Sequence, residues 1–332
     1  MTQGQIYKIH SDFYYVTAGT EIFECKVREV LKKQKEKIFV GDFVEFDGGY
    51  INKILPRKNF IPRPSVANID QIIIVSALKQ PDLDFIQLNR YIAFAKYYKI
   101  PIVLCFNKED LEFEEDVINR IFDIYKKLNF NIVFTSATEK QGISPFKKLL
   151  DGKVSVLCGN SGVGKSSLIN AINPELNLKT KAVSDKLQRG THTTRHCEII
   201  KINKTSSIVD TPGFSNVKFD FIMPADVDLL FDEMIDLREN CKYSDCLHIN
   251  EDGCAVLDNL AEIDDTRYES YLVFVKEAKE FKERIKSEGK KTEYNKKIIN
   301  NKSVAKISER KRLSARNTLR QKTYKEIEGE DL

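Results

Sequence analysis

From about residue 68, short continuous apolar runs alternate with segments whose apolar residues recur at helical spacing. In "DFIQLNRYIAFAKYY", Phe85, Leu88, Ile92 and Ala95 fall on one helical face. Further helices are predicted for "EDVINRIFDIYKKL", "GISPFKKLL" and "KSSLINAI". The intervening runs resemble strands buried on both faces of a sheet: "QIIIVSAL", "IPIVLCFN", "NIVFTSA", "KVSVLCG" and "SSIVDTPG". Residues 65–219 are therefore predicted to form an α/β domain with a parallel, doubly wound sheet.

Residues 1–64 follow a period of two instead. In "IFECKVREV", Phe23, Cys25 and Val27 alternate with charged residues, and "VGDFVEFDGGYI" has turn glycines between apolar pieces. We expect a small all-β barrel of the oligonucleotide-binding (OB) type, although an SH3-like barrel would show a similar pattern. The stretch "PRKNFIPRP" then predicts a linker to the next domain.

After about residue 220 the pattern becomes mostly helical, and residues 285–332 form a basic tail. Between Lys282 and Lys325, 16 Lys and Arg face 4 Asp and Glu, a charge of +12 that leaves −8 for the rest of the chain. This asymmetry predicts a polyanionic partner, and a merely solvated tail is the alternative. No apolar run approaches the roughly 20 residues of a membrane span. Seven cysteines, an odd number, suit a reducing compartment, so we expect a cytoplasmic protein.

The segment "GNSGVGKSS" follows a predicted strand and opens a predicted helix, as a nucleotide phosphate loop does. Its glycines let backbone N–H groups surround the phosphates, Lys165 reaches the β- and γ-phosphates, and the Ser166 hydroxyl ligates Mg²⁺. The expected phosphate site consists of Gly159, Asn160, Ser161, Gly162, Val163, Gly164, Lys165, Ser166 and Ser167.

The tetrapeptide "DTPG" ends another predicted strand, 45 residues after that lysine. Asp210 suits the second side of a magnesium site, and the Gly213 N–H can meet the γ-phosphate. In the preceding stretch "RGTHTTRH", Thr193 is expected to complete the magnesium shell in the triphosphate state, with Thr194 as the alternative.

The stretch "NKED", Asn107, Lys108, Glu109 and Asp110, ends a buried strand and predicts guanine recognition. The Asp110 carboxylate can accept from guanine N1–H and the exocyclic amine, whereas adenine would leave it unpaired at a cost of about 1–3 kcal/mol. Asn107 would brace neighbouring loops, and the Lys108 stem would lie over the base. "TSA" ends the next strand, where the N–H of Ser136 or Ala137 can bind the guanine carbonyl.

These base-reading motifs precede the phosphate loop, the reverse of the order in ordinary GTPases. The carboxyl ends of parallel strands converge on one crevice whatever their order along the chain. The sequence therefore predicts a circularly permuted GTPase that binds GTP or GDP with Mg²⁺. Its switch loop "DTPGF" leads directly into the helical segment, so the nucleotide state would pass to that segment through a short covalent link.

The catalytic group departs from the common pattern of small GTPases. Many small GTPases orient the attacking water with a Gln after Asp-x-x-Gly, but Phe214 occupies that position here. His192 is the candidate replacement, and its alternative is a loop histidine in contact with RNA or solvent. Arg189 and Arg195 could stabilise phosphate charge or contact RNA.

The segment "CKYSDCLHINEDGC" predicts a metal site. Cys241, Cys246, His248 and Cys254 supply three thiolates and one imidazole, a closed tetrahedral set for one structural Zn²⁺. Unligated core cysteines are the alternative. The helical zinc-binding domain would span residues 220–284.

Over roughly residues 1–280 the chain resembles the circularly permuted, small-subunit-dependent bacterial GTPases of the RsgA or YjeQ type. The resemblance rests on "VGDFVEF", "FNKED", "TSA", "GNSGVGKSSLIN", "RGTHTTRH", "DTPGF" and the cysteine spacing. It implies an RNA-binding OB barrel, late maturation of the small ribosomal subunit, and ribosome-stimulated GTP hydrolysis with release. The family's switch-region histidine maps onto His192. The long tail is not covered, and Gly162 stands where some potassium-activated GTPases have Asn.

We therefore expect a monomeric GTP hydrolase whose partners are the small ribosomal subunit and its rRNA, with no membrane partner. Two alternatives remain open at this point. One is a permuted GTPase of large-subunit assembly, and the other is an RNA-binding scaffold in which the nucleotide is only structural.

Overall fold

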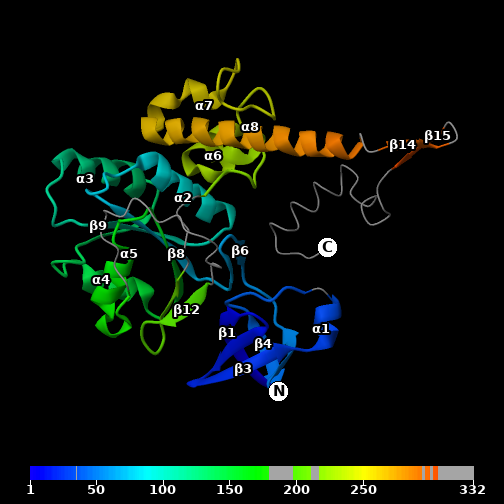
Figure 1. Ribbon diagram of the computed structural model, residues 1–332. Coiled ribbons are helices and arrows are strands. Elements are labelled where there is room, and N and C mark those ends of the chain that lie inside the picture. The colour runs from blue at the N-terminus through cyan, green and yellow to red at the C-terminus, as the bar shows by residue number, and fades with distance from the viewer. Residues whose placement is uncertain (35, 179–196, 211–216, 294–295, 300–301, 306–332) are drawn as a thin grey trace. The chain divides into compact units, whose positions relative to one another are not determined.

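The computed structural model describes residues 1–34, 36–178, 197–210, 217–293, 296–299 and 302–305. The chain divides into two compact units, Met1–Val217 and Lys218–Leu332. The first unit holds a β-barrel and an α/β domain, and the second is mostly helical (Figure 1).

The barrel consists of β1 (Thr2–His10), β2 (Phe13–Ala18), β3 (Glu21–Val27), β4 (Phe43–Asp47) and β5 (Tyr50–Ile54). Its strands pair in the closed order β1-β2-β3-β5-β4-β1, in which only β3 and β5 are parallel. Helix α1 (Glu29–Gln34) lies between β3 and β4 in the chain. This ring order is that of an OB-type barrel, which decides between the two barrels that the sequence allowed. Its core consists of Ile6, Val16, Cys25, Val27, Leu31, Val44, Phe46 and Ile51. Of the three alternating residues, Cys25 and Val27 lie in this core, and Phe23 is partly buried against it.

The predicted linker contains regular secondary structure. Its residues contribute to a hairpin of β6 (Phe60–Pro62) and β7 (Ser65–Ala67). Arg57, just before the hairpin, donates from Nε to the buried carboxylate of Asp42 at 2.7 Å. Gly41 adopts φ +93°, and a Cβ there would lie 2.0 Å from the carbonyl oxygen of Ala67. The barrel and the hairpin therefore approach so closely at Gly41 that only glycine fits.

The α/β domain is a six-stranded part of a longer sheet, in the order β10-β9-β8-β11-β13-β12. All neighbours are parallel except β12 and β13. The strands are β8 (Gln71–Ala77), β9 (Ile102–Asn107), β10 (Asn131–Thr135), β11 (Val154–Cys158), β12 (Glu198–Lys201) and β13 (Ser207–Asp210). Strand β12 also pairs with β1, where Lys8 and Glu198 form a 3.0 Å salt bridge, so the sheet continues into the barrel.

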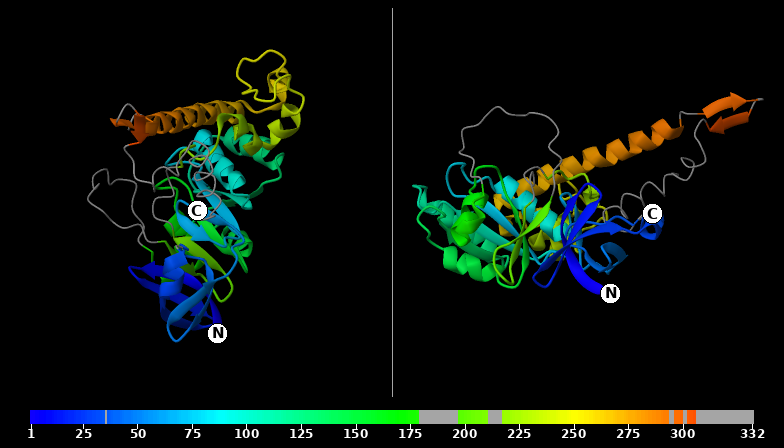
Figure 2. Two further views of the ribbon diagram at one scale, coloured as in Figure 1. Left: turned by 90° about the vertical axis from the view of Figure 1, so that its right-hand side faces the viewer. Right: turned by 60° about the horizontal axis from the view of Figure 1, so that its bottom comes forward.

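Helices cover both faces of this sheet (Figures 1 and 2). They are α2 (Phe85–Tyr97), α3 (Glu115–Ile121) with a following π-helical turn η1 (Phe122–Lys126), α4 (Ile143–Leu150) and α5 (Lys165–Ile172), followed by the 3₁₀ turn η2 (Pro174–Leu176). Phe146 of α4 and Leu168 of α5 share one core with Ile73 and Val75 of β8. Helices α2 and α3 lie on the opposite face. The predicted doubly wound architecture is confirmed.

The chain order of the strands is that of a permuted domain. From β8 the chain proceeds outward to β9 and β10, then returns to place β11 on the other side of β8. The direction of winding therefore reverses between β8 and β11, and ligands of open α/β sheets bind at such a switch point.

The second unit packs short helices against one long helix. The elements are η3 (Pro224–Leu230), α6 (Asp232–Arg238), α7 (Ala255–Asp258), η4 (Leu260–Glu262), α8 (Asp265–Glu293) and a hairpin of β14 (Lys296–Ile299) and β15 (Lys302–Ala305). Its core is aromatic, with Phe219 and Phe274 stacked at 4.2 Å between ring centroids.

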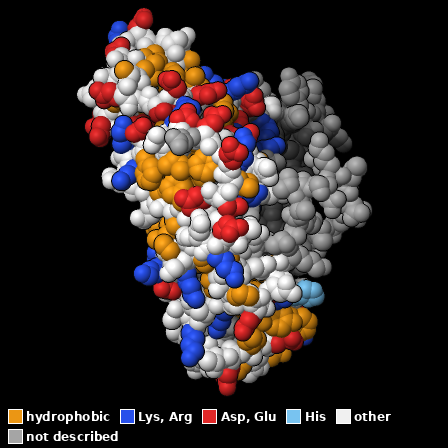
Figure 3. All heavy atoms as spheres, turned by 90° about the vertical axis from the view of Figure 1, so that its left-hand side faces the viewer, with side chains coloured by type: hydrophobic (Ala, Val, Ile, Leu, Met, Phe, Trp, Pro, Cys, Tyr) orange, Lys and Arg blue, Asp and Glu red, His pale blue; other side chains and the backbone are white. Residues whose placement is uncertain are grey.

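Helix α8 continues past residue 285, where the basic tail was expected to begin. Charged side chains of both signs cover this unit on the face shown in Figure 3. No described helix combines the length and apolarity needed to cross a membrane.

Candidate functional site

The phosphate loop joins β11 to α5 and packs tightly against its neighbours. Gly159 adopts φ +145°, and a Cβ there would lie 2.0 Å from the carbonyl oxygen of Val75. Gly164 adopts φ +96°, and its Cβ would lie 2.2 Å from Nδ2 of Asn107. Both glycines are therefore required by the close approach of other segments as well as by the backbone conformation.

Lys165 is the first residue of α5, and its side chain turns back over the loop. Its Nζ donates to the carbonyl oxygens of Gly159 and Asn160, at 2.7 and 2.8 Å. Burial lowers the pKa of Lys165 below its ordinary value. Ser166 and Ser167 follow in the first turn of the same helix, so loop and helix form the arrangement that binds phosphate groups.

Asn107, at the end of β9, connects the phosphate loop with the loop after β10. It is 1% exposed, and its Nδ2 donates to the carbonyl oxygen of Val163 at 2.8 Å. Its Oδ1 accepts from Thr135 Oγ1 at 3.1 Å and from the Ala137 N–H at 3.3 Å. One amide side chain thus holds together the segments expected to bind the base and the phosphates.

Lys108 and Asp110 continue from Asn107 along the same edge of the sheet. Lys108 is half-buried with φ +67°, and its ammonium donates to the carbonyl oxygen of Gln80. Burial lowers the pKa of Lys108. The Glu109 N–H donates to the carbonyl oxygen of Thr135 at 3.2 Å, while Asp110 is exposed.

The two N–H groups expected to bind the base already have acceptors in this structure. The Ser136 N–H donates to the carbonyl oxygen of Gln141 at 3.0 Å, in a bridge that closes the loop. The Ala137 N–H makes the longer bond, 3.3 Å to the Asn107 side chain. Of the two, Ala137 is the one that can exchange its acceptor without opening the loop.

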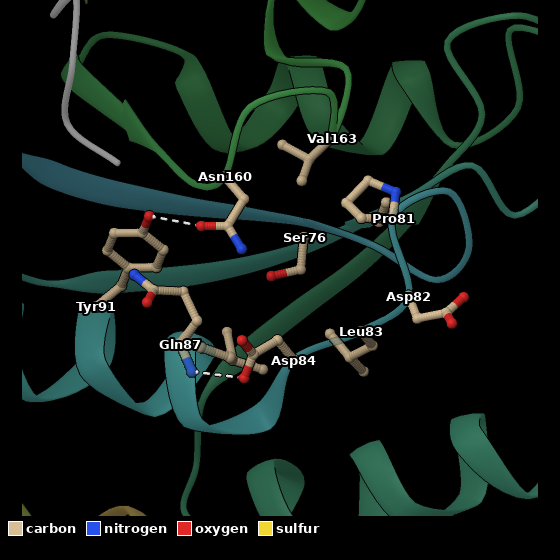
Figure 4. Close-up of a pocket in the computed structure, with 11 residues that line it drawn as sticks. Ser76, Pro81, Asp82, Leu83, Asp84, Gln87, Tyr91, Asn160 and Val163 are labelled. Carbon is tan, nitrogen blue, oxygen red and sulfur yellow. Dashed lines mark hydrogen bonds between the residues drawn. The ribbon is translucent and has the colours of Figure 1, made fainter. Parts of the chain in front are cut away.

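A small hollow lies at the switch point, between the end of β8, the start of α2 and the phosphate loop (Figure 4). Asp84 caps α2 by accepting from the Gln87 N–H at 3.0 Å. Across the hollow, Tyr91 Oη donates to Asn160 Oδ1 at 3.1 Å. Helix α2 therefore touches the phosphate loop directly, a contact that the sequence did not predict.

Three expected site residues lie outside the part of the chain that the structure describes. They are His192, Thr193 and Gly213, and the neighbouring Arg189, Thr194, Arg195 and Phe214 also lie outside it. For Asp210 the structure gives the backbone, which ends β13 and pairs with Glu198 of β12.

The four predicted metal ligands converge in the second unit. The donor atoms of Cys241, Cys246, His248 and Cys254 all lie within 4.8 Å of one another. His248 Nδ1 lies 3.2 Å from Cys254 Sγ and 3.6 Å from Cys241 Sγ, and these two sulfurs are 4.0 Å apart. Tetrahedral Zn²⁺ with bonds of about 2.3 Å to sulfur places sulfurs about 3.8 Å apart, so the donor set fits this ion.

A buried carboxylate orients the imidazole of this cluster. Asp228, which is 2% exposed, has Oδ2 at 3.0 Å from His248 Nε2 and at 2.8 Å from Arg238 Nε. A proton on Nε2 leaves Nδ1, which faces the sulfurs, as the ligating nitrogen. Asp228 lies 13 residues before Cys241 in a turn with no motif of its own, so no sequence signal identified it.

The loop between the ligands is held by its own hydrogen bonds. Glu251 accepts from the N–H groups of Ile249, Asn250 and Leu247 at 2.8–3.1 Å. Burial alone would raise its pKa, but these three bonds hold the pKa of Glu251 at about 2. Tyr268 of α8 donates to the carbonyl oxygen of His248 at 2.8 Å, which fixes the loop to the long helix.

Comparisons with known proteins agree with this geometry. Residues 54–220 match the family described as RsgA GTPase, and residues 3–51 match the RsgA N-terminal domain. Residues 154–302 also match the description 50S ribosome-binding GTPase. The small ribosomal subunit biogenesis GTPases RsgA of Caldanaerobacter subterraneus subsp. tengcongensis and Shouchella clausii are 42% and 38% identical to the chain. These matches cover 85% and 86% of the chain and 97% and 100% of the two relatives.

Two solved structures are similar over most of their length. YjeQ from Thermotoga maritima is 35% identical with a TM-score of 0.73, covering 83% of this chain and 98% of YjeQ. YloQ, described as a circularly permuted GTPase, is 30% identical with a TM-score of 0.70, covering 84% of this chain and 96% of YloQ.

Proposed function

The chain belongs to the RsgA family of GTPases, and we propose that it binds the small ribosomal subunit late in maturation and leaves it after subunit-stimulated GTP hydrolysis. The observation that carries the nucleotide assignment is the Asn107 side chain, which joins the phosphate loop to both base-reading loops. This connection supports the assignment of one ligand to all three segments.

Guanine specificity is assigned to Asp110 and Ala137. The Asp110 carboxylate accepts from guanine N1–H and the exocyclic amine, and the Lys108 stem covers the ring. The Ala137 N–H exchanges Asn107 for the guanine carbonyl, since its present bond is the longer of the two in that loop. Adenine would leave the Asp110 carboxylate unpaired, which favours GTP over ATP by about 1–3 kcal/mol.

Phosphate and magnesium binding are assigned to the phosphate loop and the switch segments. Lys165 exchanges the carbonyls of Gly159 and Asn160 for phosphate oxygens, and Ser166, Asp210 and Thr193 hold Mg²⁺. Gly213 contacts the γ-phosphate, and His192 orients the attacking water. A bound Mg²⁺ supplies charge neutralisation at the β- and γ-phosphates.

One structural Zn²⁺ is assigned to Cys241, Cys246, His248 and Cys254. The close-packed donors and the Asp228 contact to the imidazole support this assignment. The ion supplies folding energy to the loop of residues 241–254 and takes no part in hydrolysis.

The assignment of partner rests on the extent of the similarity. The small-subunit relatives cover 85–86% of the chain, barrel included, whereas the match to large-subunit GTPases begins only at residue 154. We assign rRNA contact to the OB barrel of residues 1–64 and to the basic tail. We assign GTP hydrolysis to residues 65–219 and zinc binding to residues 220–284, the bounds predicted from the sequence. We expect the protein to be a monomer in the cytoplasm.

Single-turnover hydrolysis tests this function directly. Radiolabelled GTP is followed with the protein alone, with isolated small subunits and with isolated large subunits. Acceleration by small subunits alone is the expected result. Acceleration by large subunits alone would instead indicate a GTPase of large-subunit assembly. No acceleration by either subunit would indicate an RNA-binding scaffold.

A further inference from the structure

Helix α2 carries three consecutive polar residues that are almost completely buried. Asn89, Arg90 and Tyr91 are 0%, 9% and 2% exposed. Buried polar groups are stable only when they are hydrogen-bonded, and a buried guanidinium is especially costly without acceptors. An apolar helix face would pack without this requirement, so these residues call for an explanation.

Each of the three residues bonds to a different segment of the first unit. Asn89 Oδ1 accepts from Tyr125 Oη of η1 at 2.9 Å. Arg90 Nη1 donates to the carbonyl oxygen of Val217 at 3.3 Å. Tyr91 Oη donates to Asn160 Oδ1 in the phosphate loop at 3.1 Å. Successive helical residues project about 100° apart, so α2 lies among these three segments and connects them.

The Tyr91 contact reaches the part of the phosphate loop that responds to the nucleotide. The Asn160 backbone carbonyl accepts from Lys165 at 2.8 Å, while its side chain accepts from Tyr91. The γ-phosphate adds a second anionic partner for the Lys165 ammonium, so GTP competes with this carbonyl more strongly than GDP does. Asn160 therefore lies between the nucleotide and α2.

The Arg90 contact reaches the junction of the two units. Val217 is 8% exposed and is the last residue of the first unit, and Lys218 begins the second. In the sequence, Val217 follows the "DTPGF" segment after only two intervening residues. Arg90 therefore holds the backbone at the point where the chain leaves the GTPase domain.

We propose that α2 couples the phosphate loop to this junction, with Tyr91 and Arg90 as positioning residues at the two contacts. The Asn89 bond to η1 ties the helix to its neighbour between these two contacts. The junction then senses the nucleotide by two routes, the covalent switch segment and the helix. This inference rests on the proposed binding of GTP at the phosphate loop.

Hydrogen exchange at the junction tests the coupling in the full-length protein. Backbone exchange of the peptide covering residues 217–223 is measured with GDP and with a non-hydrolysable GTP analogue. Fluorescent nucleotide titrations of the same samples report the affinity for each. The variants are Tyr91→Phe, which removes only the hydroxyl, Arg90→Met, and Arg90→Lys, which keeps a cationic donor. Tyr97→Phe, at the far end of α2, is the matched control.

In the wild-type protein we expect exchange at residues 217–223 to differ between the two nucleotides by about fivefold or more, the lower end of typical couplings. Tyr91→Phe and Arg90→Met should remove most of this difference and change nucleotide affinity by less than about threefold. Arg90→Lys should restore part of it, and Tyr97→Phe should preserve it. A variant that merely loosened the fold would raise exchange equally with both nucleotides.

The outcomes separate this inference from the proposed function. If the wild-type protein binds no guanine nucleotide, the proposed function fails. If it binds nucleotide but residues 217–223 exchange identically with GDP and the GTP analogue, the coupling fails alone. If Tyr91→Phe and Arg90→Met both keep the wild-type difference, the covalent switch segment carries the signal and α2 does not.

Discussion

Replacing Asp228 with Asn tests whether the buried carboxylate controls metal binding in the second unit. The substitution keeps the shape and one acceptor oxygen but removes the negative charge. Asp228 Oδ2 accepts from both His248 Nε2 and Arg238 Nε, at 3.0 and 2.8 Å. In the variant the bond to His248 loses its charge assistance, and the bond to Arg238 changes from an ion pair to a hydrogen bond with one charged partner.

The size of the effect can be worked from these two bonds. A hydrogen bond to a charged group contributes about 1.5–3 kcal/mol and a neutral one about 0.5–1.5 kcal/mol, so the His248 bond is weakened by about 1–1.5 kcal/mol. The lost ion pairing with Arg238 adds up to about 1 kcal/mol. Part of this loss is offset for two reasons. Arg238 is 25% exposed and can be hydrated, and the variant no longer has the desolvation cost of a buried carboxylate at this position. The net expectation is a 10- to 100-fold loss of zinc affinity, roughly 1.4–2.7 kcal/mol, which is usual for partners of a metal ligand.

The assay is competition between the protein and a chromogenic zinc chelator, followed by absorbance. The matched control is Asp226→Asn, in the same 3₁₀ helix η3, whose side chain is not among the metal contacts. Thermal unfolding measured with and without zinc shows which form the substitution destabilises. We expect the unfolding temperature to fall in the zinc-loaded form. A zinc affinity of Asp228→Asn within about threefold of the wild-type value would show that the carboxylate does not orient His248.

Three further predictions concern the nucleotide and the ribosome. Asp110→Asn should weaken GTP binding by about 5- to 150-fold and improve xanthosine triphosphate binding, and unchanged GTP affinity in a competition titration would remove Asp110 from the base site. His192→Ala should spare GTP binding but reduce subunit-stimulated single-turnover hydrolysis by about 10²-fold or more, and a wild-type rate would shift the role to Arg189, Arg195 or a ribosomal group. Deleting residues 306–332 leaves α8 and the β14–β15 hairpin intact and should flatten the slope of log affinity for the subunit against log salt, by about 0.7–0.9 for each rRNA phosphate that the tail neutralises. An identical slope would mean that residues 306–332 are only solvated.

The elements with a clear apolar period were predictable from sequence. Buried strands such as "QIIIVSAL" and helices such as "DFIQLNRYIAFAKYY" appear where their patterns place them, as β8 and α2. The convergence of the cysteine cluster was also predictable, because the three thiols and the imidazole come from one short segment. In both cases the information is local.

The rest depended on contacts between distant residues. The pairing of the short strand β12, Glu198–Lys201, with β1 could not be predicted, because β1 lies in another part of the sequence. The stretch "PRKNFIPRP" was predicted to be a linker because prolines are typical of connecting segments. Strands β6 and β7 have only three residues each, which is too short to show a period in the sequence. Helix α8 continues to Glu293, into the segment assigned to the basic tail, and the charged sequence of its last turns has no apolar period that would predict a helix there.

The functional contacts show the same limit. The buried run Asn89 to Tyr91 resembles an ordinary polar interruption of an amphipathic helix until its three partners are known. The bond between the Ser136 N–H and the Gln141 carbonyl is the reason that we propose the Ala137 N–H, rather than the Ser136 N–H, as the donor to the base. Neither fact has a signature in residue type or spacing.

The permuted strand order also has a consequence for biosynthesis. Gln71 and Ser155 are neighbours across β8 and β11 but lie 84 residues apart in the chain. At ordinary elongation rates of about 5–20 residues per second, β8 waits roughly 4–17 s for this partner to be made. Ile72 to Val75, fully buried in the finished sheet, spend that interval beside an unpaired edge. In an unpermuted GTPase the phosphate-loop strand is synthesised first. In this protein it is synthesised after β8, so β8 stays exposed for longer. We therefore expect depletion of chaperones to lower the soluble yield of this protein while leaving the activity of each folded molecule unchanged.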